Sequence, residues 1–359
     1  MSEQSSIELS AFIETIQRFR EKELEPNILD WEEKEAPLAD SVLKTGFEIG
    51  LFNFWLPSQL GSAPLLSGLL PKMEVVKELA RSSADFAWLV SLQILASLIW
   101  QNLDQSQKEK IFDDITQSSS PKLFALALWE PRVKCFGDII SKISSSSLSV
   151  KKHLVAFADK ASWFIFLVKD EQDELKFIVC ERSQLKSIEF KPQPCLGLRQ
   201  IGRFEISAEL ASSSDLFFTV EDAKEILNQL VKESSFLSLA VMLGCAQSAY
   251  ERAKNYAEER YQGGKIIIDH PVIQDMLLNM QAKIKNAELA LKKAAEDEIQ
   301  PESLAGLRRE LSNDLIELAL DAIQVLGGYG YMLDYGQEKR FRDITSLCLL
   351  EFPAQFELV

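Results

Sequence analysis

The stretch Gln324-Val-Leu-Gly-Gly-Tyr-Gly-Tyr331 closes a long segment with an apolar stripe. The stripe has the three- and four-residue steps of an α-helix and consists of Leu304, Leu307, Leu311, Leu315, Leu318, Ala322 and Leu326. Gly327-Gly328 is expected to end the helix, since glycine readily adopts the backbone of a helix C-terminus. A glycine pair also lets bare backbone approach a large ligand, to which the Gln324 amide could hydrogen-bond. A plain helix end, with Tyr329 and Tyr331 packed beside it, is the alternative interpretation.

A second segment with glycines lies upstream, between two helical patterns. It reads Tyr256-Ala-Glu-Glu-Arg260-Tyr-Gln262-Gly263-Gly264-Lys265 and continues to His270-Pro-Val-Ile-Gln274. The planar guanidinium of Arg260 is suited to a pyrophosphate, and the glycines allow close backbone approach. An apolar stripe of core residues follows at helical spacing: Ile273, Leu277, Met280, Ile284, Ala287 and Leu291.

In this order, the two segments resemble the signature of the flavin-dependent acyl-CoA dehydrogenases. In that family an Arg-x-x-Phe-Gly-Lys segment and a Gln-x-x-Gly-Gly turn hold the adenine-diphosphate half of a neighbouring subunit's FAD. The resemblance implies that the cofactor is FAD and that its ligands here are Arg260, Gln262, Gln324, Gly327 and Gly328. It also implies that Glu351, which follows Arg342-Asp343, is the catalytic base. The base takes the α-proton of an acyl-CoA while the β-hydrogen leaves as hydride to the flavin.

Hydrophobic periodicity divides the chain into three regions. Residues 1–120 are helical in pattern, residues 121–220 contain short β-branched and aromatic runs typical of strands, and residues 221–359 are helical again. We therefore expect an α+β protein with an N-terminal helical domain and a central β-domain. The resemblance implies that the β-domain is barrel-like and that the C-terminal domain is a four-helix bundle that oligomerises.

The bulk composition excludes several classes of partner. The formal net charge of -15 argues against nucleic acid, whose phosphates favour clustered Lys and Arg. The five cysteines are widely spaced without a metal-ligand pattern, and no signal peptide opens the chain, so a cytoplasmic location with reduced thiols is expected. The apolar stretch from Phe86 to Trp100 is too short to span a membrane and predicts a buried helix.

The β-domain departs from the family at the positions that should contact the flavin ring. The Thr-Glu-Pro-x-x-Gly-Ser-Asp segment is present only as Trp129-Glu-Pro-Arg-Val-Lys-Cys-Phe136. The Trp-Ile-Thr segment aligns with Leu154-Val155-Ala156, which has neither the indole nor the hydroxyl. In the third region, Gly263 replaces the family's Phe and Pro271 replaces a Gln that helps hold FAD.

The expected base also has unusual neighbours. The family follows it with Gly-Thr, whereas Phe352-Pro353 follow Glu351 here; Pro fixes φ and has no N–H. Some family members carry the base on a helix before the Arg segment, and Glu233 lies about one residue from that place. Such a shift turns a side chain by about 100°, which makes Glu233 a weak candidate.

The segments that serve a neighbouring subunit are thus retained, while those that serve the chain's own site are lost. This pattern favours one subunit of a heteromeric acyl-CoA dehydrogenase, in which a homologous subunit supplies the flavin-ring pocket and the base. The resemblance implies acyl-CoA as substrate and an electron-transfer flavoprotein as electron acceptor. A self-sufficient homomeric enzyme that uses Glu351 is an alternative. Another is a non-catalytic relative that binds an acyl-CoA or a protein without flavin.

Overall fold

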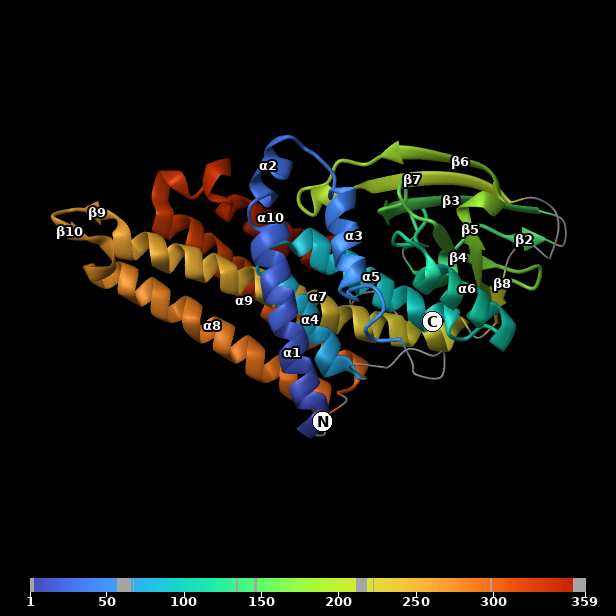
Figure 1. Ribbon diagram of the computed structural model, residues 1–359, viewed down its shortest axis with the longest axis horizontal. Coiled ribbons are helices and arrows are strands. Elements are labelled where there is room, and N and C mark those ends of the chain that lie inside the picture. The colour runs from blue at the N-terminus through green and yellow to red at the C-terminus, as the bar shows by residue number, and fades with distance from the viewer. Residues whose placement is uncertain are drawn as a thin grey trace.

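The computed structural model describes residues 3–56, 66, 68–133, 135–144, 147–210, 218–221, 223–297 and 299–350. The N-terminal region consists of helices around a common core (Figure 1). Its described elements are α1 (Glu3–Phe19), a short π-helical turn (Arg20–Leu24), α2 (Ile28–Glu33), α3 (Asp40–Glu48), α4 (Leu69–Ala80), α5 (Ala84–Trp100) and α6 (Gln105–Gln117). The predicted apolar stretch forms α5, which is buried on all sides apart from a partly exposed Leu98.

Two four-stranded sheets form the central region, in the orders β1-β4-β5-β8 and β2-β3-β7-β6. The strands are β1 (Phe124–Ala127), β2 (Ile143–Ser144), β3 (Ser147–Ala156), β4 (Trp163–Lys169), β5 (Leu175–Glu181), β6 (Leu185–Pro192), β7 (Arg203–Leu210) and β8 (Phe218–Val220). Pairing is antiparallel except between β1 and β4. The predicted barrel-like β-domain is therefore present. Ser144 at the end of β2 pairs with Ser147 at the start of β3.

Strand β4 shows why the first sheet lies in the middle of the molecule. Side chains alternate between the two faces of a strand, and both faces of β4 are buried. Trp163, Ile165 and Leu167 join the helical core, whereas Phe164 and Phe166 pack in a second core between the sheets. In β6, by contrast, all residues are exposed or only partly buried, and its weak apolar pattern explains why the sequence did not predict it as a strand.

The C-terminal region is a bundle of α7 (Ala223–Glu259), α8 (Pro271–Glu296), α9 (Pro301–Leu326) and α10 (Gln337–Leu350). Both predicted apolar stripes are in contact with the core: the Ile273–Leu291 stripe lies on α8 and the Leu304–Leu326 stripe on α9. Helix α7 is long and apolar enough to cross a membrane by length and composition, but 72% of its apolar window is buried inside the protein. It is a core helix that also packs against α4 and α5.

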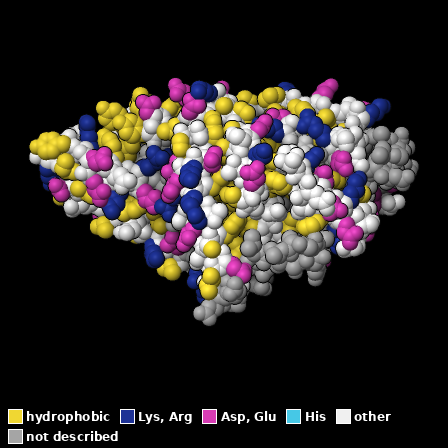
Figure 2. Space-filling view, in the orientation of Figure 1, with side chains coloured by type: hydrophobic (Ala, Val, Ile, Leu, Met, Phe, Trp, Pro, Cys, Tyr) yellow, Lys and Arg dark blue, Asp and Glu magenta, His cyan; other side chains and the backbone are white. Residues whose placement is uncertain are grey.

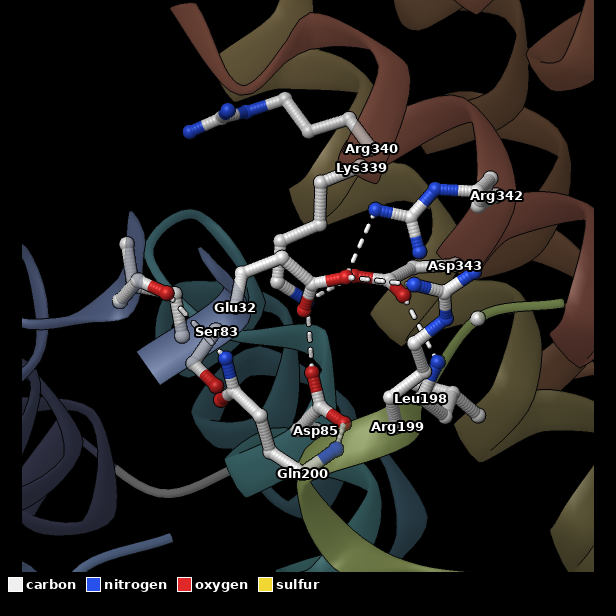
Figure 3. Close-up of polar contacts among 12 residues, drawn as sticks. Glu32, Ser83, Asp85, Leu198, Arg199, Gln200, Lys339, Arg340, Arg342 and Asp343 are labelled. Carbon is white, nitrogen blue, oxygen red and sulfur yellow. Dashed lines mark hydrogen bonds and ion pairs between the residues drawn. The ribbon is translucent and has the colours of Figure 1, made fainter. Parts of the chain in front are cut away.

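A cluster of buried charges joins α10 to the N-terminal region (Figure 3). We call Glu32, Asp85, Lys339, Arg342 and Asp343 the junction cluster. Lys339 Nζ donates to Asp85 Oδ2 at the start of α5 (2.7 Å) and to Asp343 Oδ2 on its own helix (2.6 Å). Arg342 Nη2 donates to Glu32 Oε1 on α2 (2.7 Å). Burial alone would lower the pKa of Lys339, but the surrounding carboxylates outweigh burial and raise it, so the ammonium stays charged.

The junction cluster also binds the turn between β6 and β7. The Leu198 amide donates to Asp343 Oδ1 (2.8 Å), and the Gln200 amide donates to Asp85 Oδ1 (2.9 Å). Gly197 is required in this turn because a Cβ there would lie 2.5 Å from the carbonyl of Arg342. The same carboxylates therefore link all three regions of the chain.

We expect Lys339→Met to destabilise the protein by about 3–5 kcal/mol, because it leaves Asp85 and Asp343 buried without their counter-ion. Urea unfolding measures this change. The matched control is Lys293→Met, which removes an exposed lysine paired with Asp297 and should leave the unfolding free energy nearly unchanged. Equal stability of the two variants would contradict the role given to the junction cluster.

Candidate cofactor site

The structure brings together the two glycine-containing segments at one end of the bundle. Helix α7 ends at Glu259, just before Arg260, and α9 ends at Leu326, just before Gly327. The guanidinium carbon of Arg260 lies 5.6 Å from the centroid of the Tyr329 ring, within the range of a cation–π contact. In Figure 1 this end of the molecule lies at the left, beside the β9–β10 hairpin.

The hairpin is formed by β9 (Tyr261–Gln262) and β10 (Lys265–Ile266). Gly263 and Gly264 form its turn with φ values of +65° and +86°, a conformation that disfavours other residues. His270 Nε2 lies 3.0 Å from the Gln262 carbonyl oxygen, and a Cβ at position 263 would lie 3.2 Å from the same ring. The imidazole therefore occupies space beside Gly263, which leaves little room there for the Phe of the family.

The glycines after α9 are present for different reasons. Gly327 has a φ of +57°, so the backbone of the turn requires it. Gly330 packs so tightly that a Cβ would lie 2.2 Å from the Ile323 carbonyl oxygen. Gly328 has neither constraint: its φ is not in the left-handed region, and no described atom lies within 4 Å of a Cβ placed there. Its lack of a side chain leaves the backbone at this position accessible to a ligand or to another subunit.

Two polar groups at this site are available to a ligand. The Arg260 Nε atom is buried and has no hydrogen-bond partner among the described residues, which is costly unless a further group binds it. The Gln324 side chain is exposed, while its backbone carbonyl accepts the hydrogen bond that ends α9. An orphaned Arg donor, an exposed amide and uncovered glycines fit the diphosphate half of FAD.

The surface around this site is rich in exposed hydrophobic side chains. The group comprises Tyr261, Val272, Tyr329, Tyr331, Met332 and Leu333, each more than two fifths exposed. Figure 2 shows hydrophobic side chains gathered at this end of the molecule. Contiguous exposed apolar surface is typical of an interaction site.

In the β-domain, the residues that align with the family's flavin-ring segments instead contact other residues of the same chain. The Trp129 ring is stacked on Phe136 at 4.4 Å between centroids. The next residue, Glu130, accepts a hydrogen bond from the buried Lys152 Nζ (2.7 Å) and from the Ile140 amide (2.8 Å). Burial lowers the pKa of Lys152 to about 8 despite the opposing charge of Glu130.

The second segment expected to contact the flavin, Leu154-Val155-Ala156, also makes contacts within the chain. Leu154 has a φ of +53° at an irregularity of β3, and its amide donates to Gln193 Oε1 (2.8 Å). A surface depression of about 300 Å³ opens beside it, lined by Glu35, Pro192, Gln193, Pro194, Cys195, Leu198, Arg199, Gly202, Arg203 and Phe204. This lining offers no indole and no hydroxyl. The described residues of the β-domain therefore do not fit the family's flavin-ring contacts.

The two candidate bases differ in what the structure shows of them. Glu233 on α7 is tied to Lys72 on α4, with 3.1 Å between Nζ and Oε2, and both side chains are largely buried. The Glu233 carboxylate is thus engaged by a side chain of α4, which argues against Glu233 as the base. Glu351 lies outside the described residues, directly after the end of α10.

Comparison with protein families agrees with this architecture. Residues 6–119 match the acyl-CoA dehydrogenase N-terminal domain, and residues 226–351 match the acyl-CoA dehydrogenase C-terminal domain. Together these matches cover about two thirds of the chain. The chain belongs to the acyl-CoA dehydrogenase family, and the predicted family and fold are confirmed.

The curated relatives are distant but span nearly the whole chain. A 3-(aryl)acrylate reductase from Clostridium sporogenes is 25% identical and covers 94% of this chain and 93% of its own length. The caffeyl-CoA reductase–Etf complex subunit CarC from Acetobacterium woodii is 26% identical over the same shares of the two chains. Each is an oxidoreductase or a subunit of one, so the prediction of an oxidoreductase is supported at the level of the family.

A solved structure shows the same fold. A glutaryl-CoA dehydrogenase from Mycobacterium smegmatis in complex with FADH2 aligns with a TM-score of 0.85 at 16% identity, covering 99% of this chain and 92% of that one. FAD is the cofactor of the family, which confirms the cofactor prediction at that level.

Alanine substitutions test the different roles of the glycines. We expect Gly330→Ala to cost about 1–3 kcal/mol of stability, because the methyl group would overlap the Ile323 carbonyl. Gly328→Ala should leave the stability of the isolated chain unchanged or raise it by up to about 1 kcal/mol. Thermal or urea unfolding distinguishes the two. A large loss of stability in Gly328→Ala would show that the fold, and not an external partner, requires that glycine.

Proposed function

We propose that this chain is one subunit of a heteromeric, FAD-dependent acyl-CoA dehydrogenase. In this proposal its Arg260, Gln262, Gln324, Gly327 and Gly328 form a diphosphate pocket for FAD bound mainly by a homologous partner subunit. One observation carries the proposal: the chain keeps an open, polar site facing outward, while its own flavin-ring positions are filled by Trp129, Phe136 and Gln193.

The proposed chemistry is the α,β-oxidation of an acyl-CoA thioester, with the partner supplying the flavin-ring pocket and the base. FAD would accept the hydride when bound. Arg260 would hold the diphosphate by charge-assisted hydrogen bonds, which are the stronger kind. The exposed hydrophobic side chains around Tyr329 would become buried against the partner subunit.

An electron-transfer flavoprotein is the proposed electron acceptor. The support is a relative whose name places it in a complex with such a protein, the caffeyl-CoA reductase–Etf complex subunit. We also propose a cytoplasmic location, with which the five free cysteines agree.

Purification of the protein alone and with its partner tests the heteromer directly. The chain alone should carry little FAD and no dehydrogenase activity, and the complex should carry one FAD for each pair of unlike subunits. Absorbance of bound flavin gives both values. A yellow, active homo-oligomer would instead establish the self-sufficient enzyme, whereas failure of any partner to restore flavin would favour a non-catalytic relative.

Arg260→Ala should weaken FAD retention in the complex by roughly 1.5–3 kcal/mol, the value of a hydrogen bond to a charged group. FAD affinity, measured by flavin fluorescence during dilution, checks this. Arg309→Ala is the control, since it removes an exposed arginine from the side of α9. If the complex binds FAD equally well after Arg260→Ala, the pocket assignment is wrong.

Glu351→Gln should leave the activity of the natural complex nearly unchanged, because the partner supplies the base. A working general base contributes about 10²–10⁴-fold in rate. Steady-state kinetics of the complex therefore separate the two cases, and a loss of that size would identify Glu351 as the base.

A further inference from the structure

Arg260 is held in an unusual setting at the end of α7. No carboxylate of the described residues lies within ion-pair distance of its guanidinium, so its charge is not neutralised inside the part of the chain that the structure describes. The side chain is partly buried, and its described contact is with the face of the Tyr329 ring at 5.6 Å. An aromatic face attracts a cation without using up its N–H donors.

The Tyr329 ring is itself fixed by two other tyrosines. Its centroid lies 5.2 Å from Tyr335 and 6.3 Å from Tyr256, and those two rings are 6.2 Å apart in an edge-to-face arrangement. Tyr256 lies one helical turn before Arg260 on α7, whereas Tyr329 and Tyr335 come from the segment after α9. Burial raises the pKa of the Tyr256 hydroxyl above its ordinary value.

The backbone after α9 determines where Tyr329 lies. Gly327 turns the chain with its positive φ, and Gly330 then packs against the carbonyl of Ile323. Tyr329 lies between these two constraints, so its position is set by the turn. The resulting ring is 44% exposed, with one side directed at Arg260 and part of its surface still free.

We propose that Tyr329 is a positioning residue for Arg260. Its ring fixes the plane of the guanidinium, so that the N–H groups stay available to an external diphosphate. An arginine on a mobile side chain must lose rotamer freedom when it binds, and a preformed orientation reduces that loss. The inference rests on the proposed FAD-diphosphate pocket, to which it adds a specific role for an aromatic side chain.

The test uses the assembly that retains FAD, whether heteromeric or homomeric, and measures its FAD dissociation constant. Tyr329→Leu should weaken binding roughly 3- to 30-fold, as expected for loss of a cation–π contact. Tyr329→Phe and Tyr329→Trp keep an aromatic face and should bind FAD as the unmodified protein does. Phe190→Leu is the matched control: it removes the aromatic partner of Arg182, 4.8 Å from the Phe190 ring centroid, in the β-domain and should leave FAD binding unchanged.

A double variant separates positioning from direct contact. In an Arg260→Ala background, Tyr329→Leu should cause no further loss, because Tyr329 acts through the guanidinium. The same loss in both backgrounds would show that Tyr329 acts independently of Arg260, and the inference would be wrong. Unchanged binding in Tyr329→Leu would also overturn it. If Arg260→Ala has no effect, the pocket and this inference both fail, whereas an effect of Arg260→Ala alone removes only the inference.

Discussion

The buried ammonium of Lys339 is the interaction on which the arrangement of the three regions depends. It lies between Asp85 of α5 and Asp343 of α10, and the other oxygen of each carboxylate binds an amide of the turn between β6 and β7. Buried charges are costly when unpaired, so the three regions are stable only when they meet at this point. Helix α10, which carries Lys339, Arg342 and Asp343, ends at Leu350, the residue before Glu351.

The family resemblance implies that one chain carries parts of two different cofactor sites. In our proposal the two parts have diverged in this chain. The end of the bundle retains an unpartnered arginine donor and an uncovered glycine, which a folded monomer has no internal reason to keep. The β-domain has replaced polar contacts by the Trp129–Phe136 stack and by the Gln193 hydrogen bond to Leu154. Completion of the outward-facing part by an unlike subunit would account for this asymmetry, which is the basis of the proposed heteromer.

The glycines illustrate how a structure separates folding from function. A positive φ explains Gly327 and a close backbone contact explains Gly330, so both would be needed in a protein without any ligand. Gly328 has no such explanation, and an Ala in its place would cost the monomer nothing in packing. Gly328, which precedes the Tyr329 that contacts Arg260, is therefore the glycine of this turn that indicates a function rather than a folding requirement.

The sequence by itself determined the fold class, the long helices α8 and α9 and most of the buried strands, because hydrophobic periodicity reports directly which faces are buried. It also identified Arg260 and the glycine turn as related segments. It could not predict β6, an edge strand whose few apolar side chains are only partly buried. Nor could it predict the ion pair between Glu233 and Lys72, since those residues are distant in sequence. Only the tertiary structure showed that Tyr329 lies against Arg260 and that the junction cluster joins three regions. Both depend on the packing of separate helices, which no local pattern of residues encodes.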